Sequence, residues 1–287
     1  MTTFSKLEKQ ITTHRSSRAL IAIGFIAIIV SFLVYANNDT VTPAAIKSLQ
    51  RLAVSTYVML LVSFAAIGFG LYKLFKEKIG AQDGSTLSII ASAINNKRSK
   101  QVFLASMIGY AIFFTITSGT LLYKPDLKFT DYGVPPPMAE LSPCCNPQGT
   151  IGYMPMILAT FTEHIGLQII PLNLVLLILV SFLVGLNFAL SVKTFSMTKN
   201  SKLGSVGAVT GLFVGCPTCA GTAFFILFGL GASASATSAT IFLTTFQTQL
   251  QTIFIAISIP VLAATIWIMA RTIRKSQMGS CAIDSKQ

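Results

Sequence analysis

Long uninterrupted apolar runs dominate the hydropathy pattern of the chain. A membrane-crossing helix needs about 20 predominantly apolar residues to span a hydrocarbon core about 30 Å thick. Six runs reach or approach that length, and none of them contains Asp, Glu, Lys or Arg. The six runs are Ala19–Ala36, Leu52–Leu71, Val102–Leu122, Ile165–Val192, Leu203–Gly231 and Thr252–Ala270. The pattern predicts an all-α integral membrane protein with six transmembrane helices, a multi-pass protein of the cell membrane.

The composition agrees with this class and excludes several others. Hydrophobic residues make up 53% of the 287 residues and charged residues only 10%, against about 25% charged in a typical soluble domain. No charged residue lies inside a run, which argues against an ion- or proton-driven transporter. The chain also has no Gly-rich phosphate-binding motif, so ATP use is not expected.

The basic residues predict an orientation rather than a nucleic-acid partner. The net charge is +12, but the Lys and Arg residues fall at the ends of the apolar runs. If the six runs cross alternately, 17 of the 21 basic residues lie on one side. The other side holds only Lys47, Arg51, Lys124 and Lys128. Because short cytoplasmic loops are enriched in Lys and Arg, both termini are expected inside.

The first run has an alternative interpretation as a signal peptide. Basic residues precede it, and Val34-Tyr35-Ala36 offers a small-residue cleavage site. The run has 18 residues, which is longer than the apolar part of a signal peptide. We therefore expect a retained helix.

Two segments between the runs have a pattern of their own. On the inner side, Leu87, Ile90 and Ile94 recur at helical spacing within Asp83–Asn96. This spacing predicts a short amphipathic helix on the membrane surface. On the outer side, the loop 123–164 is rich in proline, which favours an extended backbone over a helix. Long loops with their own chemistry are often functional.

The five cysteines are the main candidates for chemistry. Cys144 and Cys145 lie in the outer loop, an environment in which disulfides can persist. Adjacent cysteines can bond to each other only through a strained ring, so separate partners or a metal are expected for this pair. Cys281 stands alone in the inner tail and is interpreted as an ordinary free thiol.

The fifth run contains the second cysteine pair. Cys216 and Cys219 form a Cys-Pro-Thr-Cys motif about midway along it. Pro217 cannot donate a backbone hydrogen bond, so a kink or break is expected there. If the helix restarts at Pro217, Cys216 caps it and Cys219 lies in its first turn, where the helix N-terminus stabilises a thiolate. This arrangement predicts a redox-active pair deep in the membrane, and the alternative is two small buried apolar residues.

An outer-loop cysteine pair combined with a membrane Cys-x-x-Cys resembles the plan of the membrane thiol oxidoreductases of the DsbB and vitamin K epoxide reductase groups. In those families, loop cysteines relay electrons between a partner protein and a Cys-x-x-Cys beside a bound quinone. The resemblance implies that Cys216 and Cys219 are the quinone-side pair. It also implies that Cys144 or Cys145 is the shuttle and that the partner is an extracytoplasmic thiol protein.

Two short elements are also similar to a second family. Leu141-Ser142-Pro143-Cys144 resembles the Ser-Pro-Cys element of CcdA/DsbD-type electron carriers. Thr218-Cys219-Ala220-Gly221 is similar to the second cysteine element of the same carriers. The resemblance is confined to these motifs and implies the same kind of activity, transfer of electrons between thiols across a membrane.

The first alternative function is metal handling. Cys thiolate and Met thioether suit Cu(I), and His suits copper or zinc. The residues that could bind copper are Cys144, Cys145, Met154, Met156 and His164. The explanation without a metal is that the methionines are packing residues and that His164 simply lies at the outer end of the fourth run.

The second alternative is a non-catalytic subunit or scaffold that binds other membrane subunits. Gly207, Gly211 and Gly215 are spaced four residues apart in the fifth run. Small residues at this spacing lie on one face of a helix and allow another helix to approach closely. In that case the glycine face would be the packing surface, and the cysteines would have no chemical role.

Overall fold

The computed structural model describes most of the chain outside the fifth expected run. The described residues are 2–37, 45–79, 85–118, 120–123, 125, 128–132, 135–144, 154–197 and 259–274. The chain divides into two compact units. One unit comprises Met1–Gly80 and Ser118–Leu176, and the other comprises Ala81–Thr117 and Leu177–Gln287.

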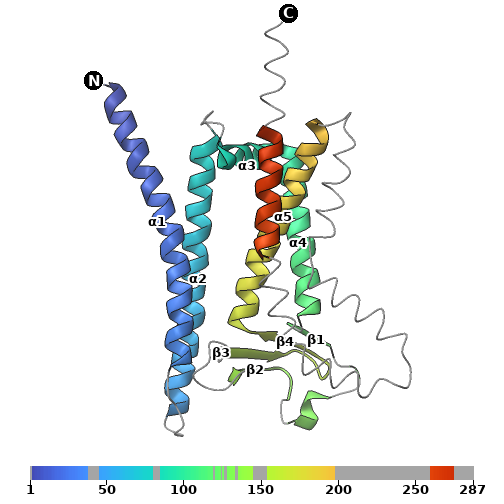
Figure 1. The fold of residues 1–287 in the computed structure, drawn as a ribbon. Coiled ribbons are helices and arrows are strands. Elements are labelled where there is room, and N and C mark those ends of the chain that lie inside the picture. The colour runs from blue at the N-terminus through green and yellow to red at the C-terminus, as the bar shows by residue number, and fades with distance from the viewer. Residues whose placement is uncertain are drawn as a thin grey trace, which may run out of the picture. The chain divides into compact units, whose positions relative to one another are not determined.

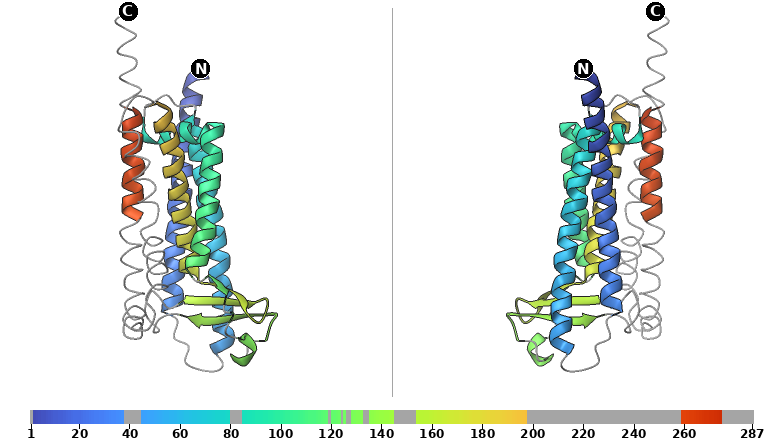
Figure 2. Two further views of the ribbon diagram at one scale, coloured as in Figure 1. Left: turned by 90° about the vertical axis from the view of Figure 1, so that its right-hand side faces the viewer. Right: turned by 90° about the vertical axis from the view of Figure 1, so that its left-hand side faces the viewer.

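The first unit begins with two long antiparallel helices, α1 (Thr2–Ala36) and α2 (Ala45–Ile79). They run side by side in Figure 1 and in the right-hand view of Figure 2. Glycines permit this close approach. A Cβ atom added to Gly24 would lie 2.5 Å from Cγ1 of Ile67, and one added to Gly70 would lie 2.8 Å from Cγ1 of Ile21. Such packing of backbone against side chain is a main source of helix association in lipid.

The first unit also contains a four-stranded antiparallel sheet, which corrects the all-α expectation. The strands, in the spatial order β1-β4-β3-β2, are β1 (Leu121–Tyr123), β4 (Ile165–Ile169), β3 (Met154–Thr160) and β2 (Met138–Cys144). A short 3-10 helix, η1 (Phe129–Tyr132), lies between β1 and β2 in the chain. Strand β3 contacts α1 and strand β2 contacts α2, so the sheet packs against the helix pair. The fold as a whole remains mostly helical.

Two expected helical runs therefore have wrong boundaries. The run Val102–Leu122 continues past the end of its helix at Thr117 into strand β1. The run Ile165–Val192 starts with strand β4, and its helix α5 (Pro171–Met197) begins only at the proline. A short apolar segment has the same hydropathy in a strand and in a helix, so hydropathy alone could not separate them. Pro171 suits the first position of a helix, where no backbone N–H is required.

The second unit contains α3 (Thr86–Asn95), α4 (Lys97–Thr117), most of α5 and a helical segment at 259–274. Helix α3 confirms the short helix expected within Asp83–Asn96. Its first turn is capped by Ser85, whose hydroxyl accepts a hydrogen bond from the backbone N of Ser88 at 3.3 Å. Serine is a favoured residue at this capping position.

Aromatic packing joins α4 to α5 within the second unit. The rings of Phe103 and Phe182 meet edge to face, with centroids 5.7 Å apart. Gly185 lies under the same ring, because a Cβ added there would come within 3.0 Å of two ring carbons of Phe103. A larger residue at position 185 would therefore collide with the ring of Phe103.

Among the described residues, four helices are long and apolar enough to cross a membrane. They are Ser16–Ala36, Gln50–Ile79, Lys97–Ile116 and Pro171–Thr194. These helices correspond to the first four expected runs. The fifth run, Leu203–Gly231, lies outside the described residues, and the described part of the sixth is helical from 259 onward. Six spans with both termini inside stay a prediction.

Candidate functional site

Cys144 lies at the end of strand β2, directly opposite Met154 of β3. The register of the β2–β3 pair also sets Met156 opposite Ser142. Directly opposed residues of antiparallel strands have Cα atoms about 4.5–5.5 Å apart. Met154 is only 2% exposed. The sheet therefore brings three of the predicted site residues, Cys144, Met154 and Met156, to one end of one hairpin.

Tyr57 of α2 ties this end of the sheet to a candidate membrane span. Its hydroxyl lies 3.0 Å from the carbonyl oxygen of Pro155 and 2.7 Å from that of Ile169. The hydroxyl has a single hydrogen, so it donates to one of the two carbonyls at a time. Pro155 is the neighbour of Met154 in β3, and Ile169 is the last residue of β4. Tyr57 thus fixes the strand that lies opposite Cys144.

Replacing Tyr57 with phenylalanine is expected to loosen this end of the sheet. The variant lacks the hydroxyl that donates to one of two carbonyl oxygens, and the loss of this hydrogen bond costs about 1 kcal/mol of local stability. Local opening of β3 and β4, and with it amide exchange, should then increase roughly fivefold. Amide hydrogen–deuterium exchange in peptides that cover β3 and β4 measures the effect.

Tyr72→Phe is the matched control for that measurement. Tyr72 lies on the same helix and is 62% exposed, so its hydroxyl is not expected to matter for the sheet. Equal exchange in the two variants would show that the Tyr57 hydroxyl does not hold the strands.

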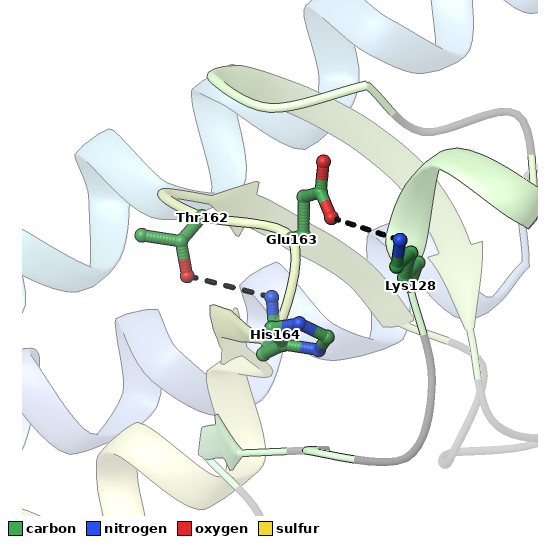
Figure 3. A network of polar contacts seen from close by, with 4 residues as sticks. All are labelled: Lys128, Thr162, Glu163 and His164. Carbon is green, nitrogen blue, oxygen red and sulfur yellow. Dashed lines mark hydrogen bonds and ion pairs between the residues drawn. The ribbon is translucent and has the colours of Figure 1, made fainter.

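His164 lies at the far end of β3 from Cys144. Strand β3 runs from Met154 to Thr160, a length of about 20 Å at about 3.3 Å per residue. The turn that follows contains Thr162, whose hydroxyl oxygen accepts from the backbone N of His164 at 3.4 Å and from that of Ile165 at 3.0 Å (Figure 3).

The charged pair of the same turn is weak. Nζ of Lys128 lies 3.9 Å from a carboxylate oxygen of Glu163 (Figure 3). Both side chains are about half exposed, and exposed ion pairs typically contribute less than about 1 kcal/mol. The pair therefore marks a solvated rim and does not act as a structural anchor.

The set of residues proposed for copper is divided between the two ends of the sheet. Cys144, Met154 and Met156 share one end, and His164 lies beyond the other. Across the described residues no group of three or more His, Cys, Asp or Glu side chains could hold a metal ion. A site built from Cys144, Met154 and Met156 would use sulfur ligands instead and would contain only one residue of those four types.

The remaining cysteines lie outside the described residues. These are Cys145, Cys216, Cys219 and Cys281. The glycine face of the fifth run, with Gly211 at its centre, lies outside them as well. The pairing of the intramembrane motif with Cys144 therefore stays a prediction.

The second unit contains a polar cluster that the sequence reasoning missed. Asn187 of α5 is 2% exposed. Its Nδ2 donates to the carbonyl oxygens of Leu183 at 3.0 Å and Leu262 at 3.3 Å, and its Oδ1 accepts from the hydroxyl of Thr265 at 2.7 Å. Interhelical hydrogen bonds in membranes contribute on average about 0.6 kcal/mol. The cluster joins α5 to the helical segment 259–274.

The sequence contains a signal for Asn187 but none for Tyr57. Asn187 carries an amide in an otherwise strongly apolar stretch, and a buried amide needs partners. The sequence therefore contains a signal for a buried polar contact at Asn187. Tyr57 gives no such signal, because a tyrosine near the end of an apolar run is typical of a membrane interface. Its acceptors lie 98 and 112 residues away in the chain.

These features define the class of the protein. Over the residues that the structure describes it is mostly helical, with four candidate membrane-spanning helices and a small antiparallel sheet that packs against the first two. The chain matches no protein-family model, no curated protein and no solved structure.

Proposed function

We propose that the protein is a multi-pass membrane thiol–disulfide relay. Its outer cysteines, Cys144 and Cys145, exchange disulfides with an extracytoplasmic thiol protein and with the Cys216/Cys219 pair. The observation that carries the proposal is the position of Cys144. It ends a strand whose neighbour is tied to a candidate span through Tyr57. A residue at the end of such a strand belongs to a sheet that packs against a candidate span, which a free loop would not achieve.

The exchange proceeds through a mixed disulfide. The Cys144 thiolate first attacks a disulfide of the partner protein, binds one of its sulfurs and releases the other as a thiolate. A thiolate of the Cys216/Cys219 pair then attacks the sulfur of Cys144 in this mixed disulfide. The partner leaves as a thiolate and takes up a proton. The second cysteine of the pair then attacks the mixed disulfide and releases the Cys144 thiolate. Two electrons have moved from the intramembrane pair to the partner.

The same steps run in reverse when the partner is the reductant. The relative reduction potentials of the two couples set the direction. In this reverse direction a quinone would suit the intramembrane end, because it would accept two electrons and two protons from the Cys216/Cys219 dithiol that the partner has reduced, and the pair would form its disulfide again. The six-span, multi-pass topology with both termini inside belongs to this proposal, since it sets the loop 123–164 on the extracytoplasmic side.

Copper handling is the second candidate, and one observation favours it. The register of β2 and β3 sets Cys144 opposite Met154, with Met156 two residues along the same strand. Thiolate and thioether sulfurs are soft ligands that suit Cu(I). In this alternative the cysteines bind metal, and they exchange no electrons with a partner.

A single preparation distinguishes the two candidates. The thiol state of the purified full chain is measured by differential alkylation and mass spectrometry, and its metal content is measured on the same sample. A disulfide that links Cys216 to Cys219, or either of them to Cys144 or Cys145, supports the relay. Protected thiols with bound copper support metal handling. Free thiols without metal favour the scaffold alternative, in which the cysteines only pack.

A further inference from the structure

One corner of the sheet exposes an apolar surface that the relay does not use. Tyr123 and Phe161 are 65% and 59% exposed, and Leu121 and Ile165 are 40% and 38% exposed. Tyr123 lies opposite Ile165 in the register of β1 and β4. Phe161 is adjacent, since its backbone N donates to the carbonyl oxygen of Ile165 at 3.0 Å. Together these four residues form a surface that we call the apolar corner.

The apolar corner continues across one whole face of the sheet. Successive residues of a strand point to opposite faces, and directly opposed residues share a face. In the strand residues whose side chains the structure describes, the face of Ile165 carries only Leu, Ile, Ala, Pro and Tyr. The opposite face carries Glu140, Thr160 and Gln168. Polar residues are therefore confined to one side.

The polar face is partly covered, whereas the apolar corner is open. A Cβ added to Gly166 would lie 3.5 Å from the ring of Phe129 in η1. Gly166 follows Ile165, so the ring packs on the face opposite to Ile165. The corner also has a charged rim, where Lys128 and Glu163 approach within 3.9 Å of each other (Figure 3).

The chain holds this sheet close to the membrane at three points. Strand β4 ends at Ile169 and the candidate span Pro171–Thr194 begins two residues later. Strand β1 begins at Leu121, shortly after the candidate span that ends at Ile116. The third tie is the hydrogen bond from Tyr57.

The position of Tyr57 along its span indicates the depth of the sheet. The candidate span Gln50–Ile79 has 30 residues, about 45 Å of helix, which exceeds the hydrocarbon core of about 30 Å. Tyr57 lies about 10 Å from the start of this span at about 1.5 Å per residue. An equal excess at both ends of the span would leave about 7–8 Å outside the core. Tyr57 and the strand ends that it contacts then lie near the boundary between hydrocarbon and headgroups. These strand ends are at the opposite end of the sheet from Tyr123, Phe161 and Ile165. The strands run across the axes of α1 and α2 (Figure 1), so the apolar corner lies at a similar depth.

We propose that the apolar corner, made of Leu121, Tyr123, Phe161 and Ile165, inserts into the interfacial layer of the lipid bilayer that the spans cross. Aromatic residues favour the headgroup level, where their rings are apolar and their polar groups stay hydrated. On insertion, the apolar side chains of this face are buried in lipid, whereas Lys128 and Glu163 remain among the headgroups. The proposal does not depend on any role of the cysteines.

Tryptophan fluorescence in lipid vesicles tests the insertion. The chain has one native tryptophan, so the full chain carrying Trp267→Phe gives a silent background. Tyr123→Trp and Phe161→Trp are made separately in this background and reconstituted into phosphatidylcholine vesicles. Glu140→Trp is the matched control, because Glu140 is an exposed residue on the polar face of the same sheet. Phosphatidylcholine brominated on its acyl chains quenches from the lipid side, and iodide quenches from water.

Insertion predicts that both corner variants emit at shorter wavelength than the control. Brominated lipid should remove most of their emission, and iodide should remove little. The control should show the opposite pattern. Strong iodide quenching of both corner variants, without lipid quenching, would overturn the proposal in favour of a solvent-exposed corner. Protection from both quenchers would overturn it as well, because protein would then cover the corner.

Discussion

Replacing either Cys216 or Cys219 with serine is expected to abolish recovery of the Cys144 thiol after the reduced protein meets oxidised glutathione. Glutathione disulfide first reacts with the Cys144 thiolate and leaves glutathione bound to it. In the relay, a thiolate of the intramembrane pair displaces this glutathione, and the second cysteine of the pair then frees Cys144. A serine hydroxyl is neither a competent nucleophile at neutral pH nor able to form a disulfide, so the sequence of steps stops.

The measurement follows Cys144 by mass spectrometry after alkylation with a membrane-impermeant reagent. All variants carry Cys145→Ser, so that a neighbouring thiol cannot displace the glutathione. With both Cys216 and Cys219 present, Cys144 should return to an alkylatable thiol and the pair should become a disulfide. With either one replaced, Cys144 should remain joined to glutathione or to the remaining intramembrane cysteine.

Cys281→Ser is the control for this experiment. Cys281 belongs to the inner tail in the predicted topology, and its replacement should leave recovery of the Cys144 thiol unchanged. Recovery at an undiminished rate in either the Cys216 or the Cys219 variant would refute the relay. Recovery that is lost together with bound copper would instead support the metal-handling alternative.

The sequence predicted the membrane helices better than it predicted the structure between them. Helices of 20 or more apolar residues satisfy their own backbone hydrogen bonds, so they follow from local composition. The sheet depends on pairing between distant segments, which composition does not encode. Leu121 pairs with Leu167 across 46 positions in the chain, and neither apolar segment differs in hydropathy from the helix that adjoins it. Both segments were therefore assigned to helices.

The candidate site, like the sheet, depends on strand pairing that the sequence alone does not predict. Ligand chemistry and nearness in the sequence group Cys144, Cys145, Met154, Met156 and His164 as a candidate copper site. In the register of β2 and β3, Cys144 lies opposite Met154, whereas His164 lies beyond the far end of β3. A hairpin folds a segment back on itself, so residues ten positions apart can be opposed while residues equally close in sequence are separated by a strand length. Only the register distinguishes these two outcomes.

Gly70→Leu in α2 is expected to destabilise the α1–α2 pair by about 1–3 kcal/mol, the usual cost of overpacking a close contact. A Cβ at this position would lie 2.8 Å from Cγ1 of Ile21 and 3.1 Å from the carbonyl oxygen of Ser17. The Ile21 side chain can rotate, but the carbonyl belongs to the backbone of α1 and cannot. The helices must therefore move apart. Thermal unfolding of the purified full chain, followed by circular dichroism in detergent, measures the loss.

Gly68→Leu is the matched control two residues earlier on the same helix. A Cβ on Gly68 would meet nothing within 4 Å, and the residue is exposed. Both substitutions add the same apolar atoms and remove the same helix-weakening glycine, which costs about 0.5–1 kcal/mol relative to alanine. The difference between the two variants thus isolates the contact with α1. Equal stability would contradict packing of α1 against the Gly70 face.

The two variants should also differ in the sheet, although Gly70 does not belong to it. Strand β3 contacts α1 and strand β2 contacts α2, so the hairpin that ends in Cys144 rests on both helices. If Gly70→Leu separates α1 from α2 along their whole length, the contacts of β2 and β3 cannot both be kept. Amide exchange in β3 should then rise in Gly70→Leu and stay unchanged in Gly68→Leu. Such a result would show that close packing of the helix pair is a condition for holding Cys144 in place, whichever chemistry that cysteine performs.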